Sequence, residues 1–184
     1  MLQRSDVRNL ALKGTDINEH IMTIYNLPVQ INAQVIVELG IGESTFALVA
    51  AANKTKGQLY SIDINEGGIE RSSPGGANVL RKEPRYHYIE GDTRELGKTW
   101  DKKIDFLLHD TDHTYETTKT ELKLWPQWVR SGGIIFAHDT AHEAGSGMGC
   151  RQAYDEFMEE HAKEYKIIHL LDTKTIGGSV LIKL

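Results

Sequence analysis

Short apolar runs alternate with longer segments of helical periodicity along most of the chain. Runs rich in Val, Ile, Leu, Phe and Tyr predict buried strands, because such residues favour extended backbone. The predicted strands lie at about 34–39, 59–64, 86–90, 104–109, 133–137, 166–171 and 179–183. Helices are expected at about 44–53, 78–83, 114–129 and 148–163. This alternation predicts an α/β fold, with a Rossmann-like, doubly wound, mainly parallel seven-stranded sheet and helices on both faces.

The segment 1–33 predicts a helical lead-in, because Ile17, Ile21 and Ile24 recur at helical spacing. We expect it to pack over a sheet edge or beside a pocket. Residues 34–184 would form the binding domain, and a chain of this length suits a single domain overall.

Two segments are rich in glycine and polar residues, at 65–77 and 140–150. Such composition is typical of loops. We expect 65–77 to be a mobile loop beside a ligand site, although a plain surface loop fits the same residues.

A sharp turn with Gly40 and Gly42 joins the first strand to the helix that opens near Ser44. Glycine lets bare backbone approach a ligand, and the N–H groups that open a helix can bind one. The next strand ends at Asp63, where a carboxylate can accept hydrogen bonds from ribose hydroxyls. These features predict a nucleotide-like cofactor site. The match to the dinucleotide fingerprint is incomplete, because Thr45 replaces its third glycine. The alternative to a cofactor site is a turn that merely reverses the chain.

Three further strands end in polar residues: Asp92 with Thr93, Asp110 with His113, and His138 with Asp139. Ligands of open α/β sheets bind where the carboxyl ends of the strands converge, although each acid could instead cap the segment that follows. His113 is the best candidate for a general base, since imidazole titrates near neutral pH. It could equally pack under the following helix. His109 lies on the other side of its strand and is expected to pack.

Composition narrows the possible partners. A net charge of −5 argues against a general nucleic-acid or anionic-membrane binder. A single cysteine, Cys150, excludes an internal disulfide and fits a reducing compartment. No apolar run approaches the roughly 20 residues of a membrane span and the start does not resemble a signal peptide, so we expect a cytoplasmic protein.

In order and spacing, the segments VELGIGEST, YSIDI, IEGDT, DFLLHDTDHTYE and SGGIIFAHDT resemble a class I S-adenosylmethionine-dependent methyltransferase. The last two are similar to the small-molecule O-methyltransferase branch that includes macrocin and cephalosporin-pathway enzymes. The resemblance covers about 34–183 and rests on the ordered set of motifs. It implies transfer of a methyl group from S-adenosylmethionine to a hydroxyl oxygen of a small molecule.

The resemblance also implies roles for residues at the strand ends. Glu38, Gly40 and Gly42 would line the methionine part of the cofactor, Asp63 would hold the ribose, and Asp92 with Thr93 would flank the adenine. Ser44 and Asp110 would also border the cofactor, and Asp110 would act in catalysis with His113.

Enzymes of this branch often hold a divalent cation such as Mg²⁺ between acids at the positions of Asp110 and Asp139. His138 stands where an oxygen donor would be expected, and we include it in the candidate metal set. Because Mg²⁺ prefers oxygen ligands, the histidine favours a softer metal, a ring that points away, or no metal.

Two other classes remain open from the sequence. A nicotinamide-dependent oxidoreductase would share the glycine turn and Asp63 but would leave Asp110 and Asp139 unexplained. A non-catalytic accessory protein could keep the cofactor fold alone. The loops do not name the acceptor, and a homo-oligomer could help to close a pocket built by so short a chain.

Overall fold

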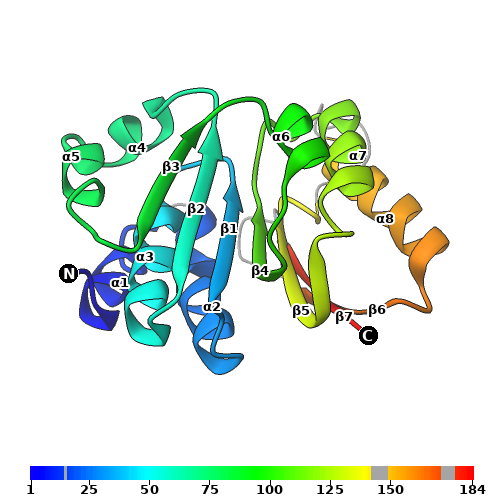
Figure 1. The fold of residues 1–184 in the computed structure, drawn as a ribbon, viewed down its shortest axis with the longest axis horizontal. Helices are drawn as coiled ribbons and strands as arrows, with labels where there is room; N and C mark the ends of the chain where they lie inside the picture. Colours follow the sequence, from blue (N-terminus) through cyan, green and yellow to red (C-terminus); the bar gives the residue numbers. More distant parts are fainter. Residues whose placement is uncertain (15, 142–148, 171–176) are drawn as a thin grey trace.

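The computed structural model describes residues 1–14, 16–141, 149–170 and 177–184, and its core is a seven-stranded sheet (Figure 1). The strands are β1 Val35–Leu39, β2 Gln58–Asp63, β3 Tyr86–Glu90, β4 Ile104–His109, β5 Val129–His138, β6 Tyr165–Leu170 and β7 Gly178–Lys183. The helices are α1 Arg4–Leu10, α2 Asp16–Gln30, α3 Glu43–Thr55, α4 Gly67–Ser72, α5 Gly76–Leu80, α6 Thr93–Thr99, α7 Tyr115–Leu124 and α8 Cys150–His161.

The strand order is β3-β2-β1-β4-β5-β7-β6, and β7 runs antiparallel to both of its neighbours. The chain passes from β1 outward to β3 and then returns to place β4 on the other side of β1. This reversal leaves a crevice outside the carboxyl ends of β1 and β4, where Leu39 and His109 are in register. Open α/β sheets bind their ligands at such a point.

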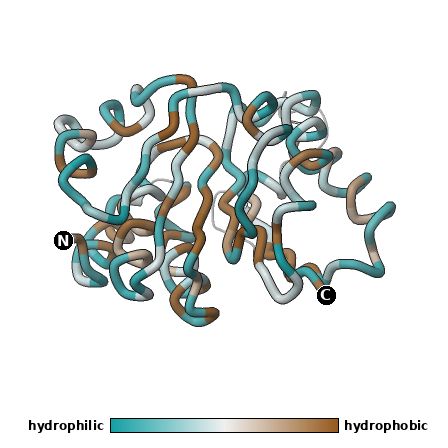
Figure 2. Tube along the Cα trace, in the orientation of Figure 1, coloured by the Kyte–Doolittle hydropathy of each residue, from teal (hydrophilic) through white to brown (hydrophobic). Residues whose placement is uncertain are grey.

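Alternation along the central strands divides the core into two layers. Ile36 and Phe106 pack with α1, α2 and α3 on one face, whereas Val37 and Leu107 pack with α7 and α8 on the other. Figure 2 shows hydrophobic residues concentrated along the central strands and hydrophilic ones along the outer helices and turns. The predicted mainly parallel sheet with helices on both faces is therefore confirmed.

The predicted helical lead-in folds as two helices rather than one. α2 packs along α3 and reaches β4 and β5, and it buries Ile21 and Ile24 completely. Its isoleucine stripe therefore forms part of the same apolar layer as α3. Among the residues described, no helix combines the length and the apolar character that crossing a membrane would require.

The prediction of a loop at 65–77 is wrong, because most of that segment forms α4 and the start of α5. Its apolar residues are anchors: Ile69 is fully buried and Ala77 is 4% exposed. Its glycines permit close packing, since a Cβ at Gly68 would lie 2.1 Å from the carbonyl oxygen of Ile41. Gly68 therefore allows close contact between α4 and the turn after β1.

Other boundaries shift for local reasons. The predicted helix 114–129 ends at Leu124, because Pro126 cannot continue the backbone hydrogen bonds of a helix. β5 begins at Val129, four residues earlier than predicted, through a pair with Ile104 that precedes an irregularity in the ladder. Positions 148 and 171, predicted as a helix start and a strand end, and most of the predicted loop 140–150 lie outside the described residues.

Candidate active site

The turn after β1 brings the backbone against the end of β4. Gly40 has φ +82°, and a Cβ there would lie 1.9 Å from the carbonyl oxygen of Asp110. Only glycine fits this conformation and approach. A Cβ at Gly42 would meet nothing within 4 Å, so this second glycine leaves open space beside the opening of α3.

Glu38 lies beneath this turn and is fully buried. Its carboxylate accepts hydrogen bonds from Ser44 Oγ at 2.6 Å, Thr45 Oγ1 at 2.9 Å and Ser61 Oγ at 2.6 Å. Burial raises its pKa to about 7, although the three hydroxyls act in the opposite direction. Glu38 thus ties β1 to α3 and β2 from behind, and it is not among the residues that line the cavities described below.

Asp63 closes the turn from the neighbouring strand. Its Oδ2 accepts a hydrogen bond from the backbone N–H of Ile41 at 3.0 Å, and its Oδ1 accepts one from Asn65 at 3.3 Å. The carboxylate therefore stands at the end of β2, beside the glycine turn, as the sequence predicted.

Two cavities open at the carboxyl ends of the strands. We call the first, of about 460 Å³, the rim cavity; its lining includes Gly40, Asp63, Asp92, Thr93, Asp110 and His113. We call the second, of about 630 Å³, the side cavity; its lining includes Gly42, Ser44, Asp110, His113, His138 and Asp139. Asp110, His113, Ile41 and Arg71 line both cavities, so the two spaces meet there.

Asp92 adopts the capping role that the sequence left as an alternative. Its Oδ1 accepts the backbone N–H of Arg94 at 2.8 Å, and both of its oxygens contact the Arg94 guanidinium. The hydrogen bonds from Arg94 hold the pKa of Asp92 below its usual range. Asp92 borders the rim cavity with its carboxylate already engaged.

Asp110, His113 and Asp139 offer ligand atoms within 4.8 Å of one another. His113 Nδ1 lies 2.7 Å from Asp139 Oδ2 and 3.9 Å from Asp110 Oδ1. His113 and Asp139 have left-handed backbone, with φ 62° and 57°. Non-glycine residues rarely adopt this conformation, and it clusters at functional sites.

His138 completes the charged cluster. Its Nδ1 lies 3.0 Å from Asp139 Oδ2 and 3.4 Å from Asp110 Oδ1, and its ring is buried. His138 is therefore adjacent to the acids, but the compact group of three donors contains His113 in its place.

The electrostatics of this cluster favour ion pairs. Although burial opposes charge on the rings, the bonds to Asp139 and the charge of Asp110 raise the pKa of His113 to about 11 and that of His138 to about 10. Burial opposes charge on Asp139 as well, yet the two histidines hold its pKa well below the usual range. Both acids therefore favour the protonated form of the two rings.

Comparison with known proteins decides the family. Residues 37–140, more than half of the chain, match the model of a family described as a methyltransferase domain. The chain belongs to this methyltransferase family. The resemblance predicted from the sequence motifs is thereby confirmed, and the oxidoreductase alternative finds no support.

Solved methyltransferases share the fold at low identity. TomG from Streptomyces achromogenes, an O-methyltransferase in complex with SAM, superposes with a TM-score of 0.69 at 14% identity, covering 97% of this chain and 88% of that one. An O-methyltransferase from Bacillus cereus in complex with SAH gives 0.66 at 17% identity, covering 96% and 84%. An rRNA methylase from Streptococcus thermophilus gives 0.66 at 12% identity, covering 94% and 99%. Because the structures that share this fold include both O-methyltransferases and an rRNA methylase, the fold does not identify the methyl acceptor of this chain.

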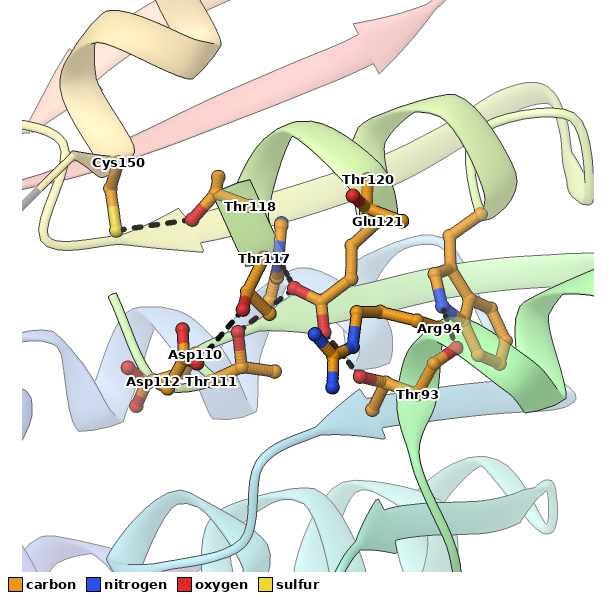
Figure 3. A network of polar contacts seen from close by, with 12 residues as sticks. Thr93, Arg94, Asp110, Thr111, Asp112, Thr117, Thr118, Thr120, Glu121 and Cys150 are labelled. Atoms are coloured by element: carbon orange, nitrogen blue, oxygen red, sulfur yellow. Dashed lines mark hydrogen bonds and ion pairs between the residues drawn. The ribbon is translucent and has the colours of Figure 1, made fainter. Parts of the chain in front are cut away.

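Some residues at the candidate site were missed by the sequence reasoning. Glu121 lies 1% exposed within α7, and Thr111 beside it lines the rim cavity (Figure 3). Arg71, on α4, lines both cavities. Glu121 sits in the strongly polar stretch KTELKL, which reads as a solvated face, and Arg71 sits in the segment read as a loop. Neither position carried a signal in the sequence.

A cavity of about 570 Å³ between α7 and α8 contains none of the predicted site residues. It lies away from the strand ends where the predicted residues gather. The rim and side cavities, where the predicted site residues gather, are therefore the candidate active site.

Proposed function

We propose that this methyltransferase binds S-adenosylmethionine in the rim cavity and transfers its methyl group to a hydroxyl oxygen of a small molecule held in the side cavity. The observation that carries the proposal is the junction of the two cavities at Asp110 and His113. A methyl group on the sulfur of the cofactor would face the acceptor at this junction.

The cofactor residues fit this orientation. Asp63 would accept the ribose hydroxyls, and Asp92 with Thr93 would border the adenine. Gly40 and Gly42 leave bare backbone along the path towards the side cavity, near Ser44 and Asp110. Glu38 would support the turn from beneath rather than touch the ligand, since its carboxylate is bound to three hydroxyls.

The cofactor supplies an already activated methyl group on a sulfonium sulfur. The acceptor oxygen forms a bond to that carbon, the carbon–sulfur bond breaks with its electron pair on sulfur, and the hydroxyl proton leaves to a base. Alignment can supply roughly 7–11 kcal/mol, against roughly 3–5 kcal/mol for a base that contributes about 10²–10⁴-fold. Positioning by the walls of the two cavities is therefore the larger contribution.

His113 is the proposed base, with Asp110 and Asp139 orienting its ring. Because both acids stabilise the protonated ring, His113 must lose its proton before it can accept one from the acceptor. Replacing His113 with Ala should slow turnover while cofactor affinity persists, and unchanged turnover would remove it from the mechanism.

A divalent cation is the alternative use of the same group, and His113 would then be a ligand rather than the base. Asp110 and Asp139 would supply oxygen donors and His113 a nitrogen donor, which suits Mn²⁺, Co²⁺ or Zn²⁺ better than Mg²⁺. Such an ion would polarise the acceptor hydroxyl and lower its pKa. His138, predicted as a ligand, would support the two acids from the buried side.

Small hydroxylated acceptors fit the dimensions of the side cavity, which is also lined by Lys13 and Asp16 from the N-terminal segment. The net charge of −5 disfavours RNA as the acceptor. We propose that a second subunit of a homo-oligomer completes this pocket.

Calorimetric titration with S-adenosylhomocysteine, with NADH as the control, tests the cofactor site. We expect saturable binding of S-adenosylhomocysteine that Asp63→Ala abolishes, and no binding of NADH. Release of S-adenosylhomocysteine from the methyl donor would then be measured across hydroxylated compounds, with RNA as a separate arm. Binding without transfer to any acceptor would favour the accessory-protein alternative.

A further inference from the structure

A buried hydrogen-bond network centred on Glu121 lies behind the rim cavity (Figure 3). Thr93 Oγ1 donates to Oε1 of Glu121, and Thr111 Oγ1 donates to Oε2 at 2.9 Å. His109 Nε2 lies 2.6 Å from the same Oε2. A buried carboxyl group is costly unless it is hydrogen-bonded, and here both oxygens have partners.

The network continues away from the cavity to α8. The hydroxyl of Tyr154 lies 2.5 Å from His109 Nδ1, and both side chains are buried. Burial raises the pKa of Tyr154, so its hydroxyl keeps the proton. When Tyr154 donates to Nδ1, His109 Nε2 carries a proton to donate to Glu121, and every member is satisfied.

The two threonines belong to segments that the sheet itself does not join. Thr93 begins α6 after β3, and Thr111 follows β4, whereas β2 and β1 lie between those strands in the sheet. Both threonines line the rim cavity. Glu121 does not line it, yet its two oxygens span from one wall to the other.

We propose that Glu121 is a positioning residue that fixes the separation of the two walls of the rim cavity by holding Thr93 and Thr111. This inference rests on the proposed cofactor site. Glu121 acts through the threonines, so its loss lowers cofactor affinity by letting the walls move apart. The wall at Thr93 keeps a second anchor, because Trp125 Nε1 also donates to the carbonyl oxygen of Thr93 at 3.1 Å.

Glu121→Gln is the direct test, because it keeps the shape and places an amide NH₂ where one oxygen accepts. Leu122→Ala is the matched control: Leu122 is the next residue of α7, is buried, and lines neither the rim cavity nor the side cavity. Both variants should lower Tm. We expect roughly tenfold weaker binding of S-adenosylhomocysteine in Glu121→Gln, equivalent to about 1.4 kcal/mol, and an unchanged Kd in Leu122→Ala.

Thr111 provides a second route that does not depend on the folding of Glu121→Gln. Thr111→Val removes the hydroxyl and keeps the shape, whereas Thr111→Ser keeps the hydroxyl. We expect Thr111→Val to weaken binding and Thr111→Ser to retain it. In the double variant with Glu121→Gln, the losses should be less than additive, because both changes act on the same hydrogen-bond network.

Measurements run well below the Tm of every variant separate the outcomes. If Glu121→Gln and Thr111→Val bind S-adenosylhomocysteine as the wild type does, Glu121 only stabilises the fold and the inference is overturned. Additive effects in the double variant would equally overturn it, since Thr111 would then act on the cofactor independently. If the wild type does not bind S-adenosylhomocysteine, the proposed cofactor site fails and this inference fails with it.

Discussion

Ser61 Oγ donates a hydrogen bond to Glu38 Oε2 at 2.6 Å, with both residues buried beneath the glycine turn. Glu38 and Ser61 are in register on neighbouring strands, β1 and β2. This contact fastens the turn that borders both cavities to the strand that ends in Asp63. The protonation state of the Glu38 carboxyl group therefore affects the position of the turn that borders both cavities.

Glu38 should make stability depend on pH in an unusual direction. Burial raises its folded-state pKa from 4.5 to about 7, so the folded state binds more protons than the unfolded state between these values. The contribution of Glu38 to the free energy of unfolding is fully present below pH 4.5 and is lost as pH rises through about 7. The difference amounts to roughly 3 kcal/mol. Urea unfolding of Glu38→Gln should lose this decline, and equal pH slopes in both proteins would contradict it.

The cluster of Asp110, His113 and Asp139 should select among divalent cations. With one nitrogen and two carboxylate donors, we expect Mn²⁺ or Co²⁺ to bind more tightly than Mg²⁺, and His113→Ala to reduce this preference. Calorimetry with each metal chloride measures it directly. His138→Ala serves as the matched control, since its ring contacts the same acids. Tighter binding of Mg²⁺, or no binding of any ion, would refute the assignment.

The two glycines of the turn should respond differently to the same substitution. Gly40→Ala places a methyl group against the Asp110 carbonyl in a left-handed backbone, and it should destabilise the fold by at least roughly 1–3 kcal/mol. Gly42→Ala meets open space with φ −172°, which any residue adopts, so its stability should change little. Because Gly42 lines the side cavity, its methyl group would instead narrow the path along which the methionine part of the cofactor is proposed to lie. Urea unfolding and S-adenosylhomocysteine titration of both variants check this contrast, and equal stability losses would contradict it.

Sequence reasoning succeeded where local pattern and fold agree. β3 and β4 begin and end where the apolar runs predicted, and Asp63, Asp92 and Asp110 lie at the strand ends because parallel strands converge at one edge. His109 packs in the core, as its alternation predicted.

Sequence reasoning failed where tertiary contacts determine the local structure. The segment 65–77 has the composition of a loop, yet contact with the turn after β1 orders α4 through Gly68 and Ile69. Glu121 lies in a strongly polar stretch, and only the packing of α7 over β4 turns it inward to meet His109. The three hydroxyls that bind Glu38 come from both α3 and β2, and only the fold brings these elements together around it.

Arg71 should bind the carboxylate of the cofactor's methionine part. It projects from α4 into both cavities, whose shared wall otherwise presents Asp110 and His113 beside Ile41. A guanidinium group is the natural partner of a carboxylate in such a place. Because Arg71 is solvent-exposed, Arg71→Gln should leave Tm unchanged and weaken binding of S-adenosylhomocysteine several-fold.

An analogue of S-adenosylhomocysteine that lacks the carboxylate isolates this contact. Wild type and Arg71→Gln should bind the analogue equally, since the interaction has been removed from the ligand side. Arg94→Gln is the matched control, because Arg94 lines the rim cavity with its guanidinium already paired to Asp92. If Arg71→Gln binds both ligands as the wild type does but raises the KM of an acceptor, Arg71 serves the acceptor instead, and the carboxylate assignment is wrong.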